Sequence, residues 1–275
     1  MELDMTYRML LFGTAAILLS PLAIADDSSS QKESPWGGLL EADYTSNFYK
    51  RGSYHEARTI GLTGIVDYTF INDSKLSLNL AGFHSLDNPK GQYWRDGWLK
   101  YGHSELFDLN SWATLGMDGS IRLPMSEQSK KDDLHTSLRA ATPLTIDLGL
   151  LLTSLEFTWQ PRVMKNFHEY KTRGGQTLKE WTLENLLSLD YAPWDKWSFN
   201  ASLVLNSHWS YSGNRKKDDY IHSESLFYEF NESWSVGLMY SNTGIVYDLE
   251  RGATGSVSLY DKQNATWSLL VDYSF

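Results

Sequence analysis

The last nine residues of the chain alternate between two kinds of side chain. Every second position is apolar or aromatic, and these positions are Trp267, Leu269, Val271, Tyr273 and Phe275. The positions between them are polar apart from Leu270. Because successive side chains of a strand point to opposite faces, the segment predicts a strand with one face suited to lipid and one mostly polar face. An edge strand of a soluble β-sandwich is the alternative interpretation of the same pattern.

The first 25 residues have the layout of a secretory signal peptide. Arg8 precedes an apolar stretch, 9–25, which ends in the small residues Ala23 and Ala25, and the chain turns polar at Asp26. We therefore expect cleavage after Ala25. A membrane-anchoring helix is the alternative, but the apolar core of the stretch is shorter than the ~20 residues that a spanning helix needs.

The acidic residues Glu2 and Asp4 are unusual in a signal peptide, so translation is expected to start at Met1 or at Met5. Residues 26–35 are rich in Ser, Lys and Asp and predict a flexible periplasmic leader. The remaining residues, 36–275, are expected to form a single domain.

The composition favours membrane strands and excludes several classes of site. Aromatic residues make up 14% of the chain, with 11 Trp and 16 Tyr, yet the mean hydropathy is −0.39. This combination is normal for a barrel with a wet interior. The chain has no Cys, which excludes disulfides and Cys-ligated zinc, and its net charge of −10 argues against binding to nucleic acid.

The C-terminal pattern resembles the C-terminal signature of bacterial outer-membrane proteins, with a terminal Phe275, Tyr273 two residues before it and apolar residues at alternating positions further back. The resemblance implies that the chain is located in the outer membrane of a Gram-negative bacterium. It also implies that the five alternating residues are a signal recognised by the barrel-assembly machinery. Outer-membrane lipid and lipopolysaccharide would then surround the protein.

Short turn signals recur about every 40 residues, the length of two strands and a loop. They lie at 72–74, 108–111, 147–149, 192–196 and 231–233. Three of them lead into Trp112, Trp197 and Trp234, which we expect to form an aromatic girdle at a membrane–water interface. Longer polar stretches alternate with the turns and lie at 50–55, 85–92, 125–133, 168–179, 211–220 and 248–256.

These turns and loops separate about twelve segments of strand length. The sequence therefore predicts an all-β fold: a single closed antiparallel transmembrane β-barrel with short periplasmic turns and longer extracellular loops. Alternation is clear in segments such as 60–70, 199–205 and 236–240, and it is weakest around Trp98 and Leu138.

If the apolar face contacts lipid, the polar residues opposite line the interior, because lipid offers them no partner. The interior candidates for solute selection are Glu41, Asp43, Asp67, Asp118, Arg122, Glu156, Arg162, Glu184, Asp190, Glu229 and Asp272, with Gln160, Asn200 and Asn206 beside them. Most of these residues are acidic. An open path would then favour cations or neutral polar solutes such as sugars over anions.

No catalytic or metal site stands out, and no cofactor is expected. The strings His103-Ser104-Glu105 and His222-Ser223-Glu224 suggest a catalytic triad, but adjacent residues of a strand face opposite sides. The segment His84–Asn88 lacks the spacing of the barrel phospholipases, and His168, Glu169 and His208 show no three-ligand spacing for a metal. A basic loop at 215–217 is a candidate contact for lipopolysaccharide phosphates.

Three functions remain open at this point. The first is a channel or uptake barrel for a small polar solute. The second is a closed barrel with a structural or surface-interaction role. The third is a lipid-modifying enzyme, which would need Ser and His side chains to converge from neighbouring strands.

Overall fold

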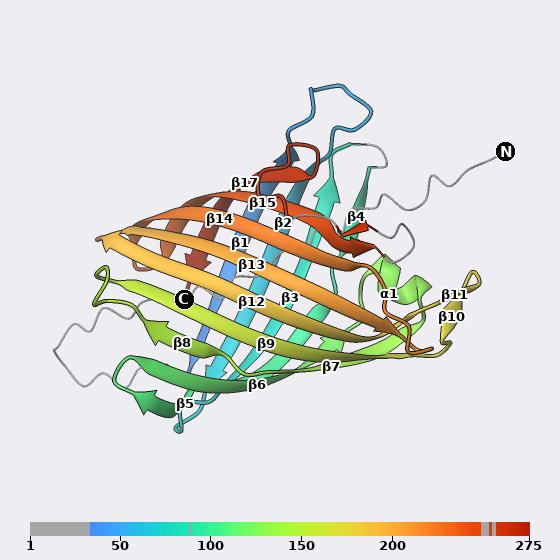
Figure 1. The fold of residues 1–275 in the computed structure, drawn as a ribbon. Coiled ribbons are helices and arrows are strands. Elements are labelled where there is room, and N and C mark those ends of the chain that lie inside the picture. The colour runs from blue at the N-terminus through green and yellow to red at the C-terminus, as the bar shows by residue number, and fades with distance from the viewer. Residues whose placement is uncertain (1–33, 88–89, 249–252, 255–256) are drawn as a thin grey trace. The chain divides into compact units, whose positions relative to one another are not determined.

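The computed structural model describes residues 34–87, 90–248, 253–254 and 257–275, and within them one antiparallel sheet closes on itself (Figure 1). Its strands are β1 (Trp36–Asn47), β2 (Arg58–Thr69), β3 (Lys75–Ser85), β4 (Gly91–Trp94), β5 (Gly97–Asn110), β6 (Ala113–Leu123), β7 (Leu134–Ala141), β8 (Leu144–Asp147), β9 (Leu155–His168), β12 (Lys179–Trp194), β13 (Trp197–Ser210), β14 (Asp218–Asn231), β15 (Trp234–Asp248) and β17 (Ala265–Ser274). A two-residue strand, β16 (Ala253–Thr254), pairs with β15. The predicted signal peptide and most of the predicted leader lie outside the described residues.

The ring has twelve strand positions, because β4 and β5 share one position and β7 and β8 share another. The prediction of an all-β barrel of about twelve antiparallel strands is confirmed. The last strand closes the ring on the first, in a register that runs from the pair Leu39–Ser274 to the pair Asn47–Thr266. Closure of this kind leaves no unpaired sheet edge, which is the condition for placing strands in lipid.

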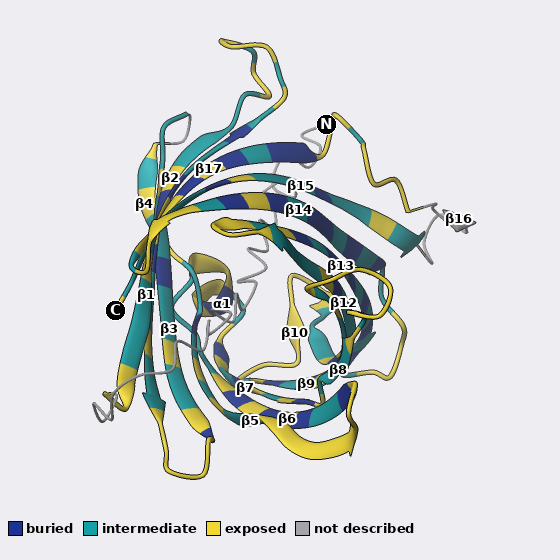
Figure 2. Cartoon of the chain, turned by 90° about the vertical axis from the view of Figure 1, so that its left-hand side faces the viewer, coloured by how far each residue is buried: buried dark blue, intermediate teal, exposed yellow. Residues whose placement is uncertain are grey.

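Burial in this barrel is inverted relative to a soluble protein. The most buried side chains along β13 and β14 are polar, such as Asn200 at 1% exposure, with Ser202 and Ser223 joined by a hydrogen bond of 2.8 Å. On the opposite face of the wall, Leu238 is 55% exposed. Figure 2 shows buried and exposed positions interleaved along the strands of the ring. The outer face is therefore apolar and the inner face polar, as alternation predicted.

Connections are short at one end of the barrel and longer at the other, as predicted. The predicted turns at 72–74, 108–111, 147–149, 192–196 and 231–233 all join consecutive strands of the ring. Asp73 and Lys196 take positive φ values of 60° and 72° there, which tight turns require. The last strand ends at this same end, where the Ser274 amide donates to the Ser233 carbonyl at 2.8 Å.

The longer connections contain secondary structure that the sequence did not predict. The loop between β6 and β7 contains a short helix, α1 (Glu127–Lys131), and the loop between β9 and β12 contains a hairpin of β10 (Thr172–Arg173) and β11 (Gln176–Thr177). Among the described residues, no helix has the length and apolar character needed to cross a membrane.

Two strand positions are interrupted, and they are the positions around Trp98 and Leu138 where alternation is weakest. Arg95 and Asp96 separate β4 from β5. Thr142 and Pro143 separate β7 from β8, where proline removes a ladder donor. The break between β4 and β5 shifts the register by one residue, since Trp94 is paired with Gly82 but Trp98 with Asn79. The break between β7 and β8 leaves the alternation of inward and outward side chains unchanged.

Two of the tryptophans that follow the short turns, Trp197 and Trp234, lie on the outer face of the wall. Trp112, Trp197 and Trp234 are all exposed, and the rings of Trp197 and Tyr228 lie 5.0 Å apart. Trp234 packs against Tyr273 at 4.9 Å, so the predicted assembly signal and the predicted girdle contact each other. This arrangement suits aromatic rings at a membrane–water interface.

The inverted burial predicts the cost of charge on the outer wall. Leu238→Arg should destabilise the folded barrel in lipid vesicles by about 2–4 kcal/mol, because arginine near the membrane midplane loses hydration. Denaturant unfolding in vesicles measures this change. Ile71→Arg, in the turn after β2, is the matched control and should leave stability unchanged. Equal and small effects would contradict lipid contact at Leu238.

Candidate functional site in the barrel interior

Three arginines from neighbouring strands gather on one side of the inner wall. Arg122 lies on β6, Arg139 on β7 and Arg162 on β9. The guanidinium carbons of Arg122 and Arg139 lie 4.7 Å and 4.4 Å from the ring centre of Trp98, on β5. Stacking on an indole orients guanidinium groups without neutralising them. We call Arg122, Arg139 and Arg162 the inner basic cluster, in which two of the three guanidinium groups are held on Trp98.

Two carboxylates lie within this cluster. Glu184 Oε2 is 4.0 Å from Arg139 Nη1 and 3.9 Å from Arg162 Nη1. Asp118 Oδ2 is 3.4 Å from Lys100 Nζ and accepts a hydrogen bond from Gln160 Nε2 at 2.8 Å. Four of the predicted interior residues, Asp118, Arg122, Arg162 and Glu184, are therefore brought together, with Gln160 between them.

Acidic residues gather on the strands that close the ring. Glu41 of β1 and Asp272 of β17 are paired in register, and Asp43 follows on the same face. A Cβ added at Gly61 would lie 1.9 Å from Asp43 Oδ1, so the carboxylate occupies the space that this glycine leaves. Arg95, at the break between β4 and β5, lies within electrostatic range of Glu41 and Asp43. The inner wall thus has an acidic side and a basic side.

A further acidic group lies toward the short turns. Glu156 and Asp190 are paired across β9 and β12, and Asn200 Nδ2 donates to Asp190 Oδ1 at 2.6 Å. Asp67 lies 3.9 Å from Lys75. Glu229, near the end of β14, is exposed and lies away from the basic cluster. The predicted interior residues therefore form separate groups and not one ring.

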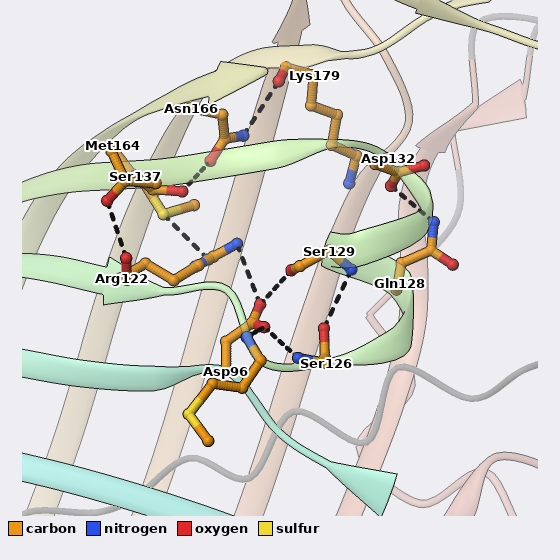
Figure 3. Close-up of polar contacts among 12 residues, drawn as sticks. Asp96, Arg122, Ser126, Gln128, Ser129, Asp132, Ser137, Met164, Asn166 and Lys179 are labelled. Carbon is orange, nitrogen blue, oxygen red and sulfur yellow. Dashed lines mark hydrogen bonds and ion pairs between the residues drawn. The ribbon is translucent and has the colours of Figure 1, made fainter. Parts of the chain in front are cut away.

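The loop that contains α1 is fixed to the inner wall by Asp96 (Figure 3). Asp96 Oδ1 accepts the backbone amides of Met125 and Ser126 at 3.0 Å and 2.8 Å. Its Oδ2 accepts the Ser129 hydroxyl at 2.5 Å and lies 3.9 Å from Arg122 Nη1. Ser126 caps α1 by accepting the Ser129 amide at 3.1 Å. One carboxylate therefore joins the interrupted strand, the basic cluster and the loop.

A second contact holds the same loop from the other side. Arg173 Nη1 of the β10–β11 hairpin donates to Asp132 Oδ1 at 2.5 Å. In Figure 2, which looks into the ring, α1 and β10 are drawn within its outline. The loop between β6 and β7 is thus tied both to the inner wall and to the neighbouring loop.

A hydroxyl, an imidazole and a carboxylate also converge from three neighbouring strands. Thr182 Oγ1 lies 3.0 Å from His208 Nδ1, and His208 Nε2 lies 3.0 Å from Asp219 Oδ2. Asn206 Nδ2 donates to Asp219 Oδ1 at 2.7 Å. Thr182 is only 3% exposed, which leaves a substrate carbonyl no approach to its hydroxyl. We interpret this group as a buried hydrogen-bond network that stabilises the wall.

The residues of the string His222-Ser223-Glu224 are separated by strand geometry and do not form a triad. Ser223 pairs with Ser202 on the inner face, whereas His222 lies 3.3 Å from Glu224 on the outer face. Among the described residues, no three His, Asp or Glu side chains are placed to hold a metal ion. His168 instead contacts Tyr211, at 3.2 Å, and Glu169 contacts His135, at 2.6 Å.

Asp96 should control the exposure of the α1 loop. Asp96→Ala removes three hydrogen bonds to one charged acceptor, each worth about 1.5–3 kcal/mol. Limited trypsin digestion after Lys130 and Lys131 should then be at least about tenfold faster, because local opening becomes more frequent. Glu127→Gln, which loses only a helical pair with Lys131, is the control. Unchanged cleavage of Asp96→Ala would contradict the anchoring role.

No family model and no curated protein matches the chain. Solved structures do match. A structure of the NanC porin has a TM-score of 0.57 and 13% identity over 86% of this chain and 98% of its own. An outer-membrane channel of Pseudomonas putida F1, described as COG4313, has a TM-score of 0.56 and 11% identity over 91% of this chain and 100% of its own.

The KdgM porin in complex with disordered oligogalacturonate has a TM-score of 0.51 and 11% identity, over 86% of this chain and 99% of its own. At such low identity the likeness concerns the fold. The chain shares the β-barrel fold of these outer-membrane channels over most of its length.

Proposed function

We propose that the protein is a bacterial outer-membrane channel that takes up small polar solutes. The observation that carries the proposal is the inner wall, where fixed charges of both signs face the interior from opposite sides. Buried charge in a purely structural barrel is costly unless it is paired or hydrated. Charges on a wet inner wall also set which solutes pass.

The inner wall favours solutes that bond to both signs of charge. Glu41, Asp43 and Asp272 supply acceptors, and the inner basic cluster supplies guanidinium donors. Neutral polar solutes such as sugars have hydroxyls that serve as both donors and acceptors. The arginines were underestimated in the sequence-based expectation of an acidic lumen. The acidic side still predicts that small cations pass more readily than anions.

The export and surface properties follow from the same proposal. A signal peptide cleaved after Ala25 delivers the chain to the periplasm, and the barrel-assembly machinery recognises the C-terminal strand that ends at Phe275. The belt of exposed tryptophans lies at the periplasmic interface, and the loops face outward. The basic residues at 215–217 then lie where lipopolysaccharide phosphates are found.

Conductance in a planar bilayer tests the channel directly. The mature protein, residues 26–275, should give discrete steps with a cation-selective reversal potential in a salt gradient. Glu41→Gln combined with Asp272→Asn should lower the cation-to-anion permeability ratio about twofold or more, because the acidic side loses charge. Glu232→Gln, in an exposed turn, should leave the ratio unchanged. A folded barrel that stays silent in the bilayer would overturn the open channel.

The anchored α1 loop favours a second candidate, a barrel that is closed at rest. In that case the wild-type protein conducts little, and Asp96→Ala conducts in larger steps because the loop leaves the inner wall. Single-channel recording of both proteins at the same voltage distinguishes the candidates. Silence of both would point to a structural or surface-interaction role.

A further inference from the structure

The outer wall of β14 and β15 changes character toward the loop end. Leu226 and Leu238 are exposed at mid-height, as lipid contact requires. Glu224 and His222 lie on the same face of β14, two and four residues nearer the loop end than Leu226. Asn242 of β15 is paired with His222. Polar and ionisable side chains on a lipid-facing wall are costly unless they are covered. His222 is 6% exposed and Asn242 0% exposed, so a cover is present.

The cover is the segment 257–260, which we call the outer strap. The Ser258 carbonyl accepts the Tyr220 hydroxyl at 2.6 Å and Asn242 Nδ2 at 2.5 Å, and the Ser258 amide donates back to the Tyr220 hydroxyl at 3.0 Å. The Tyr240 hydroxyl donates to the Leu259 carbonyl at 3.2 Å. The strap therefore gives the polar wall the hydrogen-bond partners that lipid would not supply.

Glu224 lies at the lower edge of the outer strap and is only partly covered. Its Oε1 accepts the Tyr260 hydroxyl at 2.6 Å, and its side chain remains 31% exposed. A shallow, open pocket of about 470 Å³ lies beside it on the outer wall. Besides Glu224, its lining includes Leu226, Leu238, Tyr240 and Trp267. A single carboxylate is thus set among aromatic and aliphatic side chains.

The neighbouring histidine adds a surplus of acceptors. His222 Nδ1 is 3.1 Å from the Ser202 carbonyl oxygen, which only accepts, so Nδ1 carries a hydrogen. In the neutral ring Nε2 then carries none, yet it faces the Glu224 carboxylate at 3.3 Å. Nε2 of the neutral His222 ring and the Glu224 carboxylate are both acceptors, so a hydrogen-bond donor is needed at this position. That donor is either a proton or an N–H group of a ligand.

We infer that this pocket binds a membrane amphiphile with a primary-amine headgroup. The ammonium group supplies charge and hydrogens to Glu224, and the rings of Tyr240 and Trp267 add cation–π attraction. The acyl chains lie along the apolar wall at Leu226 and Leu238, which line the same pocket. The site is on the outer wall, so it is separate from the solute path through the interior, although it does require that the barrel lies in a membrane.

Native mass spectrometry of the detergent-purified mature protein tests the site. The probes are phosphatidylethanolamine and phosphatidylglycerol with identical acyl chains, which differ in the amine. The wild-type protein should retain phosphatidylethanolamine about tenfold better, and Glu224→Gln should lose this preference. Glutamine keeps the acceptor for Tyr260, so the strap contact survives the change. Dodecylamine should displace the retained lipid, whereas dodecanol should not.

Three further variants keep the test decisive. Glu232→Gln, in an exposed turn at the other end of β14, should retain the preference. Tyr240→Leu removes one ring together with its hydrogen bond to Leu259, and it should reduce the preference several-fold. Tyr240→Phe loses the hydrogen bond alone and should retain the preference. Far-UV circular dichroism and unchanged conductance of the same samples establish that each variant is folded. No preference in the wild-type protein, or equal preference in Glu224→Gln, would overturn the inference.

Discussion

The structure depends on the pairing of every wall strand with a neighbour on each side. Once β17 bonds to β1 and β9 bonds to β12, the backbone donors and acceptors of the wall are satisfied within the ring. Only then can side chains be sorted into a mostly apolar outer set and a mostly polar inner set. The charged groups of the interior, the aromatic belt and the anchored loop all follow from this sorting. Removing the closure would remove the distinction between inside and outside on which each of them rests.

Segregation of charge across the inner wall is the second consequence of closure. Arg122, Arg139 and Arg162 come from three adjacent strands, so their approach is fixed by register and not by flexible loops. Glu41 and Asp272 come from the first and last strands and meet only because the ring closes. The stacking of two guanidinium groups on Trp98 keeps the basic side rigid. The acidic and basic sides together produce an electric field across the barrel interior, and the strand register fixes its direction.

The regular parts of the barrel could be predicted from the sequence, and the irregular parts could not. Alternation ending at Phe275 and the turn residues near Asn72 and Asn231 depend on local chemistry, which a sequence displays directly. The functional residues that were missed lie at the two interrupted strand positions: Arg95 and Asp96 between β4 and β5, Lys100 on β5, and Arg139 on β7. At the break between β4 and β5 the register shifts by one residue, so a period of two no longer tells which side chains face inward there. The sequence did contain a signal of the first break, which is Gly97 directly after Arg95 and Asp96. Glycine within a strand often marks a bulge or a bend.

The pairing of β1 with β17 also affects how the barrel folds. Thr45 and Ser268 share a hydrogen bond across a sequence separation of 223 residues, and the whole seam between β1 and β17 is similarly long-range. Pairing over such separations is slow, because the chain loses the entropy of loop closure before the stabilising contacts form. A nascent chain therefore holds two unsatisfied edges until its final residues are made. The barrel therefore cannot close strand by strand during synthesis. The chain must be kept from aggregating until β1 and β17 can pair.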